Sequence, residues 1–454
     1  ASCSGESASV RRHFCAYAMA NLVFGILRDL YVVLLIIFAI EQIPGSDLLH
    51  DVTRKGIITV TVLVVVGKLV HWLAADAGSA GGLPGRSPAR QKKTEIGKDV
   101  WMEWASSEMQ GWRPAMEDAA CIVNALGAPL SNLAFFAVFD GHGGKEVSRI
   151  AAREFPKVLT ACVSKPGLGK AAAAAEGSEG GSGSEGATPP PSAEVPSRAG
   201  DALDLGRALH SSMLTLDALI RKGGEGMASK MPPAEALGLM QPTASRNAFN
   251  LMGSTAIVVL LEHAEVADGA GSSGEGSAAA PSRGRPCRVT VANCGDSRAL
   301  LCRNGKCIEL SEDHKPELRG EEERIRKAGG HVAQVGPCHR IDGWGLNLSR
   351  ALGDFHYKAR TDLPVEEQKV SAVPEIRTLE LTDEDEFLVL GCDGIFELHT
   401  SQKAVDIVRA GLQAGLSVDK ACEELVDKSC SSNLMKTRGK GGDNCSAIVV
   451  RFSR

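Results

Sequence analysis

The sequence lacks the patterns by which cysteine usually marks a site or a disulfide framework. Its 13 cysteines are scattered over 454 residues, with neither a Cys-x-x-Cys pair nor a Cys/His zinc pattern among them. Small secreted proteins carry a dense set of paired cysteines, and this spacing does not match one. Reduced thiols in a cytosolic environment are therefore expected.

An excess of charge of either sign is also missing. Lys and Arg number 50 against 55 for Asp and Glu, and the formal net charge is −5. Because nucleic-acid-binding domains usually carry a strong basic patch, no nucleic-acid partner is expected. The 44% of hydrophobic residues and 23% of charged residues are typical of a globular chain that buries a core.

Composition divides the chain into three parts. Residues 1–75 form an apolar N-terminal region, residues 76–100 a small, polar and basic linker, and residues 101–454 one folded domain. Two low-complexity stretches, at about 164–200 and 267–285, interrupt that domain. Neither can bury enough apolar surface to offset the entropy lost on ordering, so both are expected to be disordered insertions.

Two apolar runs in the N-terminal region approach the length of a transmembrane helix. Residues 21–40 and 57–75 together predict a membrane hairpin, although Arg28 and Asp29 roughly cancel the favourable transfer of the first run. The alternative is a soluble apolar extension packed against the domain. If the hairpin inserts, the basic residues before the first run and after the second place the folded domain on the cytosolic side.

Short apolar runs bounded by turn residues predict strands, and longer periodic stretches predict helices. The expected strands are 133–139, 254–261, 288–292, 299–302, 386–390 and 446–452; the expected helices are 145–163, 202–221, 320–328, 402–414 and 417–431. A tight turn between 288–292 and 298–302 favours antiparallel pairing of these two strands. The pattern predicts an α+β domain in which helices cover antiparallel sheets.

Acidic residues recur where these strands begin or end. They are Asp140, Asp296, Asp393 and Asp443, together with Glu117 and Asp118 after the segment QGWRPAM. A carboxylate at the end of a buried strand is held rigidly, and Mg²⁺ and Mn²⁺ prefer oxygen ligands. Glycine lets the backbone approach an ion closely, so the carbonyl of Gly141 is a candidate ligand. One Asp-Gly pair is also an ordinary turn, so the argument rests on the joint pattern.

Ten motifs are distributed over residues 101–453, outside the two insertions. They are GWRPAMEDA (111–119), FFAVFDGHGG (135–144), GSTAIVVL (253–260), VANCGDSRALL (291–301), DHKP (313–316), AGGHV (328–332), LSRALGDFHYK (348–358), VPEI (373–376), FLVLGCDGIFE (387–397) and GGDNCSAIVV (441–450). Together they resemble the PPM-type (type 2C) protein phosphatases. The resemblance implies a four-layer α-β-β-α sandwich with two central antiparallel sheets, and a monomeric catalytic domain.

The resemblance also implies a centre of two Mg²⁺ or Mn²⁺ ions with a weaker third one. In this pattern Asp140 bridges two ions, Asp393 and Asp443 hold the first, the Gly141 carbonyl and Glu117 complete the second, and Asp296 with Asp393 binds the third. Asp118 would orient these ligands without touching an ion.

Two further residues are implied in catalysis. Arg113 would hold the substrate phosphate with its guanidinium group, and His142 would protonate the leaving serine or threonine oxygen. The implied reaction is direct hydrolysis of phosphoserine and phosphothreonine in proteins by a metal-activated water, without a phosphocysteine intermediate. The alternative is an inactive pseudophosphatase that binds phosphoproteins as a scaffold; such proteins usually have metal-site residues replaced, and none is replaced here.

Two departures from the family pattern affect the site. The common stretch DGIWD reads Asp393-Gly394-Ile395-Phe396-Glu397, so a local adjustment around Glu397 is expected. An extra pair, Trp344-Gly345, precedes LSRALGD, close to the flap that borders the active site in this family. Substrate access is expected to differ there.

Overall fold

A computed structural model describes residues 87–164, 204–228, 247–264 and 284–453. The apolar runs 21–40 and 57–75 and residues 76–86 of the expected linker lie outside this part of the chain. So do nearly all of the two expected insertions. Within the described residues, no helix has the length and apolar character needed to cross a bilayer.

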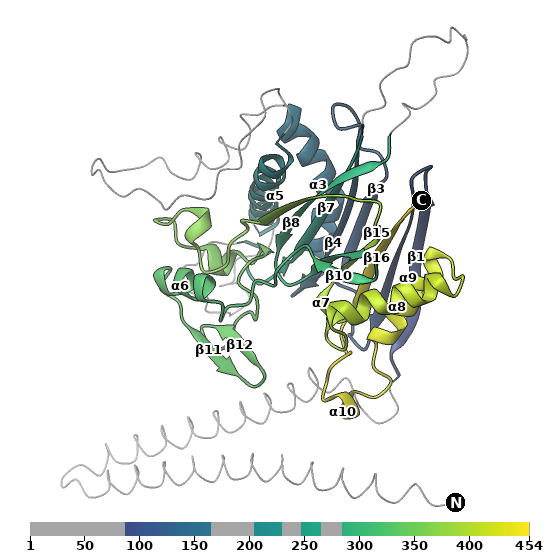
Figure 1. Cartoon of the computed structure of the whole chain (residues 1–454). Helices are drawn as coiled ribbons and strands as arrows, with labels where there is room; N and C mark the ends of the chain where they lie inside the picture. Colours follow the sequence, from purple (N-terminus) through teal and green to yellow (C-terminus); the bar gives the residue numbers. More distant parts are fainter. Residues whose placement is uncertain (1–86, 165–203, 229–246, 265–283, 454) are drawn as a thin grey trace, which may run out of the picture. The chain divides into compact units, whose positions relative to one another are not determined.

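Two antiparallel sheets lie at the centre of the domain (Figure 1). The first sheet has the strand order β14 (Glu375–Glu380), β8 (Pro286–Cys294), β7 (Ala256–His263), β4 (Leu133–Phe139) and β3 (Ala119–Val123). The second has the order β1 (Ala89–Lys98), β2 (Met102–Gly111), β16 (Cys445–Phe452), β15 (Asp385–Gly391), β9 (Arg298–Arg303) and β10 (Lys306–Glu309).

Helices cover the outer face of each sheet. Helices α3 (Glu146–Ser164) and α5 (Leu205–Ala228) pack on the five-stranded sheet, while α8 (Ser401–Gln413) and α9 (Val418–Ser429) pack on the six-stranded sheet. Strand β4 shows how the layers are joined, because alternate residues of a strand face opposite sides. Phe136 belongs to the core between the sheets, whereas Phe135 contacts Phe155 of α3, with ring centroids 5.6 Å apart. The structure confirms the α+β fold with antiparallel sheets.

Shorter elements lie around the ends of the sheets. Strands β5 (Gly141–His142), β6 (Gly253–Ser254) and β13 (Leu352–Gly353) form a small sheet of their own. Helix α6 (Arg319–Lys327) lies beside a hairpin of β11 (Val332–Val335) and β12 (Cys338–Ile341), to one side of the sandwich (Figure 1). The remaining pieces are the 3₁₀ turns η2 (Phe355–Lys358) and η3 (Val365–Glu367) and the short helices α7 (Asp393–Phe396) and α10 (Leu434–Thr437).

The expected strands and helices are all present, with bounds shifted by a few residues. The expected pairing of 288–292 with 298–302, however, is wrong. Strand β8 pairs with β7 and β14, so both of its edges are occupied, and β9 pairs with β15 and β10 in the other sheet. The turn between β8 and β9 therefore carries the chain from one sheet to the other, with Asp296 at the crossing.

The linker expected at 76–100 is also wrong in its second half. Residues 89–98 form β1, which pairs with β2 along its length. The polar side chains of this edge strand contact α9: the Nζ atom of Lys92 lies 2.8 Å from Asp427, and Thr94 donates to Glu423. An edge strand pairs its backbone on one side only and can form without a row of apolar side chains. Composition alone therefore suggested a linker here.

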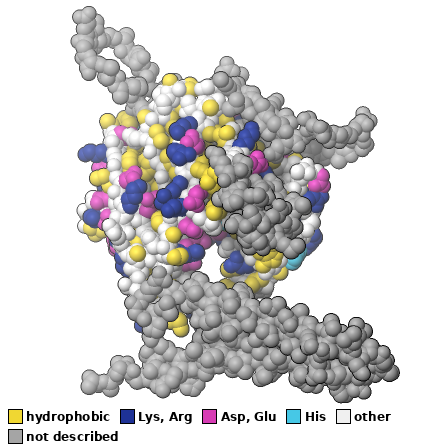
Figure 2. Space-filling model, turned by 180° about the vertical axis from the view of Figure 1, so that it is seen from behind, with side chains coloured by type: hydrophobic (Ala, Val, Ile, Leu, Met, Phe, Trp, Pro, Cys, Tyr) yellow, Lys and Arg dark blue, Asp and Glu magenta, His cyan; other side chains and the backbone are white. Residues whose placement is uncertain are grey.

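Basic and acidic side chains are interspersed with apolar ones on the face seen from behind (Figure 2). Ion pairs such as Arg288–Glu262, at 2.6 Å, join neighbouring strands of the five-stranded sheet. Mixed charge of this kind matches the near-balanced composition of the chain.

Candidate active site

The candidate site lies where three central strands end. Asp140 follows β4 of the five-stranded sheet, Asp393 begins α7 directly after β15, and Asp443 lies two residues before β16. A side chain on Gly394 would meet the Asn444 carbonyl oxygen at 2.0 Å, so the start of α7 packs directly on the segment that carries Asp443. Glycine at this position permits that approach.

These aspartates influence one another strongly. The pKa of Asp140 is raised well above its ordinary value, first by burial and then by the charges of Asp118, Asp393 and others. The pKa of Asp393 is raised well above its ordinary value for the same reasons, burial followed by repulsion from Asp296 and Asp443. The five aspartates identified in the sequence therefore lie close enough to repel one another, in a largely buried region with an excess of negative charge.

Two side-chain cations compensate part of that charge. The Nη2 atom of Arg113 lies 2.5 Å from Asp443, and the Nζ atom of Lys315 lies 2.5 Å from Asp296. Among residues 87–453, as far as they are described, no three His, Cys, Asp or Glu side chains close around one point.

The residues present fit Mg²⁺ or Mn²⁺. The donors are carboxylates and a backbone carbonyl, the hard oxygen ligands that these ions prefer. Several neighbouring carboxylates in a desolvated region are costly unless positive charge offsets them, and Arg113 and Lys315 reach only two of them. Gly141 leaves no space for a side chain, because a Cβ there would lie 2.2 Å from the carbonyl oxygen of Glu117. The segments that carry these two candidate ligands are therefore in contact.

Asp118 is bound from the other sheet. Its side chain is 5% exposed, and its Oδ2 atom accepts a hydrogen bond of 2.8 Å from the Ser446 hydroxyl on β16. Burial raises the pKa of Asp118 to about 7. The hydrogen bond from Ser446 opposes this shift, and the charge of Asp443 adds to it. This placement suits a residue that supports the other carboxylates.

Asn444 holds the segment before Asp118 in place, and sequence reasoning missed it. Its Oδ1 atom accepts from the backbone N–H of Glu117 at 3.0 Å, and its Nδ2 atom donates to the carbonyls of Gln110 and Ala115. One amide therefore fixes the loop between β2 and β3 against the loop that carries Asp443. The place of Asn444 directly after Asp443 was the signal available in the sequence.

His142 forms a close pair that sequence reasoning also missed. Its Nε2 atom lies 2.6 Å from Oδ2 of Asp354, whose side chain is 1% exposed. Burial alone would lower the pKa of His142, but the charge and hydrogen bond of Asp354 raise it. A side chain on Gly253 would collide with both partners, at 2.0 Å from Asp354 and 2.5 Å from His142. The glycine is therefore needed for this pair to form.

Residues 313–315 of the motif DHKP bind the turn that carries Asp296 through hydrogen bonds and ion pairs. Asp313 binds the guanidinium of Arg298 through two oxygens, and the Nδ1 atom of His314 accepts from the backbone N–H of Gly295 at 3.1 Å. Lys315 then reaches Asp296 itself. The structure thus explains a motif to which the sequence had assigned no role.

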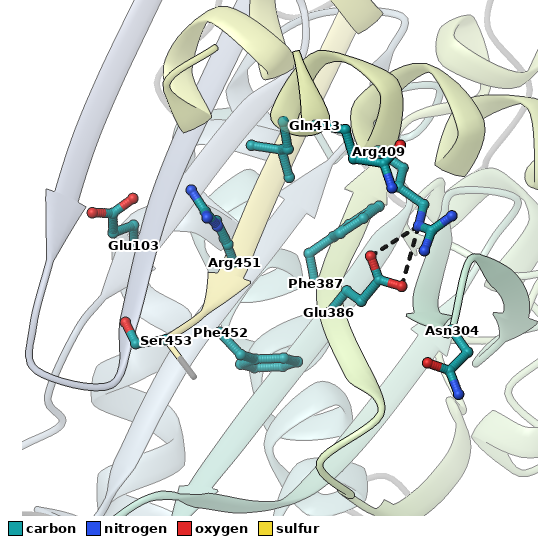
Figure 3. Close-up of a pocket in the computed structure, with 10 residues that line it drawn as sticks. Glu103, Asn304, Glu386, Phe387, Arg409, Gln413, Arg451, Phe452 and Ser453 are labelled. Carbon is teal, nitrogen blue, oxygen red and sulfur yellow. Dashed lines mark hydrogen bonds and ion pairs between the residues drawn. The ribbon is translucent and has the colours of Figure 1, made fainter. Parts of the chain in front are cut away.

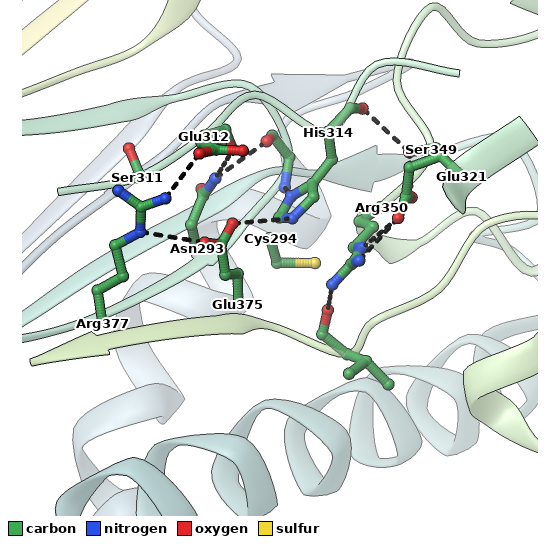
Figure 4. Close-up of polar contacts among 12 residues, drawn as sticks. Asn293, Cys294, Ser311, Glu312, His314, Glu321, Ser349, Arg350, Glu375 and Arg377 are labelled. Atoms are coloured by element: carbon green, nitrogen blue, oxygen red, sulfur yellow. Dashed lines mark hydrogen bonds and ion pairs between the residues drawn. The ribbon is translucent and has the colours of Figure 1, made fainter. Parts of the chain in front are cut away.

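A buried ionic cluster lies behind this motif (Figure 4). Glu321 of α6 binds Arg350 at 2.7 Å and Arg324 at 2.7 Å, and it also accepts from the Ser349 hydroxyl. Burial would raise the pKa of Glu321, but hydrogen bonds and charges from the two arginines lower it to about 2. The cluster attaches α6 to the segment that leads to Asp354.

Glu397 occupies the last position of the stretch that departs from the common DGIWD pattern, and it forms a contact with a neighbouring loop. Its Oε2 atom accepts a hydrogen bond of 2.6 Å from the backbone N–H of Gly441. Through this contact the end of α7 holds the loop that leads to Asp443.

A cavity of about 540 Å³ lies at the other end of the six-stranded sheet (Figure 3). It is lined by the far ends of β2, β15 and β16, including Glu103, Phe387 and Arg451, and by Arg409 of α8. The aspartates occupy the opposite ends of these strands, so the cavity is separate from the candidate site.

One cysteine has the spacing to an arginine that is found in another class of phosphatase. Cys445 and Arg451 are six residues apart, the Cys-x₅-Arg spacing of cysteine-dependent phosphatases, but they lie along β16 and not in a loop. Cys445 is fully buried, and burial raises its pKa well above the ordinary value. The thiol is therefore unsuited to act as a nucleophile.

The comparisons with known proteins agree with this geometry. The family model described as Protein phosphatase 2C matches residues 102–178 and 236–437. This chain belongs to the protein phosphatase 2C family. A relative from Oryza sativa subsp. japonica, "Probable protein phosphatase 2C 58", is 32% identical over 372 residues, which cover 81% of this chain and 88% of the relative.

Two further relatives extend the match. "Probable protein phosphatase 2C 60" of Arabidopsis thaliana is 33% identical over 373 residues, covering 81% of this chain and 90% of the relative. The crystal structure of a phosphatase from Toxoplasma gondii is similar with a TM-score of 0.54 and 25% identity, covering 80% of this chain and 96% of the other. Membership of the 2C family makes the chain a protein serine/threonine phosphatase, and nothing in these matches supports the pseudophosphatase alternative.

Proposed function

We propose that this 2C phosphatase hydrolyses phosphoserine and phosphothreonine in proteins with the help of two Mg²⁺ or Mn²⁺ ions. The observation that carries the proposal is the convergence of aspartates at the ends of β4, β15 and β16, among which Asp140 and Asp393 are buried and have pKa values raised well above the ordinary range. Asp140, Asp393, Asp443, Glu117 and the carbonyl of Gly141 would hold the two ions, and Asp296 with Asp393 a third. When bound, such ions act as Lewis acids toward phosphoryl oxygens and lower the pKa of water.

Arg113 would bind the substrate phosphate. Its side chain is 53% exposed, and only its Nη2 atom is bound to Asp443. The Nε and Nη1 groups have no hydrogen-bond acceptor among the described residues, so they are available to phosphate oxygens. A guanidinium group suits this task because it presents several N–H donors in one plane.

His142 would donate the proton to the leaving oxygen. Asp354 binds Nε2 and raises the pKa of the ring, which favours the protonated form. The other ring nitrogen, Nδ1, then carries a proton that can be transferred to the serine or threonine oxygen as the P–O bond breaks. Asp354 is a positioning residue in this scheme, because it acts through His142.

Hydrolysis of a phosphothreonine peptide by the purified full-length protein tests the proposal. Activity should require Mn²⁺ or Mg²⁺ and disappear in EDTA. The variant His142→Asn should lower kcat by roughly 10²-fold or more, and Arg113→Ala should mainly raise KM, while Arg153→Ala on the exposed face of α3 serves as control. Activity that persists in EDTA, or absence of activity with metal present, would contradict the proposal.

Location is a separate proposal that rests on the sequence. Residues 21–40 and 57–75 would anchor the chain in a membrane, with the monomeric phosphatase domain facing the cytosol. Carbonate extraction of a membrane fraction tests insertion, and protease protection of sealed vesicles tests sidedness. Recovery of the full-length protein in the carbonate-soluble fraction would rule out the anchor and leave the enzymatic proposal intact.

A further inference from the structure

Trp344 is a large apolar side chain that the domain leaves exposed. It lies directly after the hairpin of β11 and β12, and 62% of its surface is accessible. Its ring contacts the rings of His356 and Tyr357 on η2, with centroids 5.9 Å and 6.2 Å away. An indole ring normally contributes a large apolar area to a core or an interface. Its exposure here therefore indicates a surface that binds another molecule.

The backbone around Trp344 is firmly held. Gly345 donates to the Ile341 carbonyl at 2.9 Å, and a side chain at Gly345 would meet the Tyr357 hydroxyl at 2.4 Å. Tyr357 itself is 4% exposed. The indole is therefore presented by a fixed segment, which limits the entropy lost when a ligand binds.

The contacts of Trp344 lead to the catalytic histidine. His356 is two residues from Asp354, and Asp354 pairs with His142. The backbone N–H of His356 donates to the Asn250 carbonyl at 3.0 Å, which places the neighbouring residue Leu251 next to the same turn. A side chain on Gly143 would lie 2.1 Å from the Leu251 carbonyl oxygen, so this residue also borders the His142 segment.

Leu251 is exposed as well, at 57% of its surface. Trp344, through His356, and Leu251, through Gly143, each adjoin a segment that carries one partner of the His142–Asp354 pair. Two charged side chains close to Trp344 in the chain are already engaged: Asp342 is paired with Lys369 at 2.8 Å, and Arg340 donates to the Gly345 carbonyl. The surface therefore offers apolar contact in preference to charge.

We propose that Trp344, with Leu251, binds an apolar side chain close to the phosphorylated residue of the substrate and so determines which phosphopeptides are preferred. This inference rests on the proposed phosphatase function. The occupant is a segment of the phosphoprotein substrate, because both side chains adjoin the segments of His142 and Asp354, and His142 is the proposed proton donor to the leaving oxygen. A methylene-scale apolar contact changes kcat/KM by about 10-fold to 200-fold, which sets the size of the expected effect.

Kinetics with three substrates test the inference in the full-length protein with Mn²⁺. Two are phosphothreonine peptides that differ in carrying leucine or serine at the residues flanking the phosphothreonine, and the third is p-nitrophenyl phosphate, which has no peptide. We expect Trp344→Ala to lower kcat/KM for the leucine peptide by about tenfold, through KM. The serine peptide and p-nitrophenyl phosphate should be hydrolysed as by the wild type.

Three further variants sharpen the test. Trp344→Phe should retain most of the preference, and Leu251→Ala should lose part of it. Ile96→Ala is the matched control, since Ile96 is exposed to a similar degree, at 68%, on the remote edge strand β1.

An equal loss on all three substrates in Trp344→Ala would show that the indole only supports η2 and would overturn the inference. Unchanged peptide selectivity would overturn it too, as would a change of oligomeric state in sedimentation without a change in selectivity. If the wild type hydrolyses none of the three substrates, the proposed function itself fails.

Discussion

Two groups of buried carboxylates in this domain have pKa values shifted in opposite directions. Glu321 is 6% exposed, yet two arginines and a serine surround it and its pKa is lowered to about 2. Asp140 and Asp393 are crowded by other acids, and their pKa values are raised well above the ordinary range. The chain supplies positive charge for Glu321 and leaves most of the aspartate group without it.

The difference separates a structural group from a functional one. Glu321 fastens α6 to the segment of Ser349 and Arg350, and its charge is compensated within the fold. The aspartates are held at strand ends with excess negative charge, which favours the binding of a cation from outside. Four changes would break or sharpen this comparison.

The largest effect is expected for Asp393→Asn. Activity should fall by roughly 10³-fold or more, since metal ions contribute several kcal/mol to the stabilisation of a transition state. The same change should raise the free energy of unfolding in EDTA by about 1 kcal/mol, because it removes one repelling charge. Enzyme assays and urea unfolding measure the two effects. A variant that is less stable than the wild type in EDTA would contradict the comparison.

Glu321→Gln should act in the opposite direction. It leaves Arg350 and Arg324 without a carboxylate and should lower the free energy of unfolding by about 3–5 kcal/mol. Glu322→Gln is the control, because Glu322 is partly exposed and pairs with Arg326 on the same helix, so its loss should cost under about 1 kcal/mol. Equal effects of the two changes in urea unfolding would show that the buried cluster contributes little.

Acid should destabilise the fold through His314. Burial and the nearby Arg350 lower the pKa of this histidine to about 4, so the folded protein keeps it neutral. The unfolded chain binds the proton near its ordinary pKa, and the stability due to neutral His314 is therefore lost as the pH falls from about 6.5 to 4, by about 3 kcal/mol. His314→Gln should show a shallower fall of unfolding free energy over this range. An unchanged slope would contradict this assignment.

The smallest effect is expected at β1. Lys92→Ala removes a partly exposed ion pair with Asp427 and should cost about 0.2–1 kcal/mol. Lys98→Ala, at an exposed position of the same strand, should leave the unfolding free energy unchanged. A loss of several kcal/mol at Lys92 would mean that a surface pair can matter as much as the Glu321 cluster.

Much of the fold could be predicted from local patterns. The apolar run of β4 and the periodic stretch of α3 were identified because each shows its pattern of apolar residues within one continuous segment of the chain. The candidate aspartates were found for a related reason, since each lies close to the beginning or end of such a run. Their positions in the structure agree with that expectation, while their roles as ligands stay a proposal.

What the sequence could not provide depends on residues far apart in the chain. Asp354 is 212 positions from His142, and Asn444 is 327 positions from Glu117, so no local pattern links either pair. Strand β1 was not predicted because its polar side chains form hydrogen bonds with α9, which lies more than 300 positions later in the chain. The crossing between β8 and β9 was misjudged because a short turn does not reveal which strands already occupy the neighbouring edges.

The central claim is that the aspartate group is built to hold divalent cations. Calorimetric titration of Mn²⁺ into the metal-free, full-length protein tests it most directly, with Asp393→Asn and Glu321→Gln as variants. We predict that the wild type and a folded Glu321→Gln bind Mn²⁺, and that Asp393→Asn loses most of the binding. Absence of binding to the wild type at millimolar Mn²⁺, or equal binding to Asp393→Asn, would contradict the account.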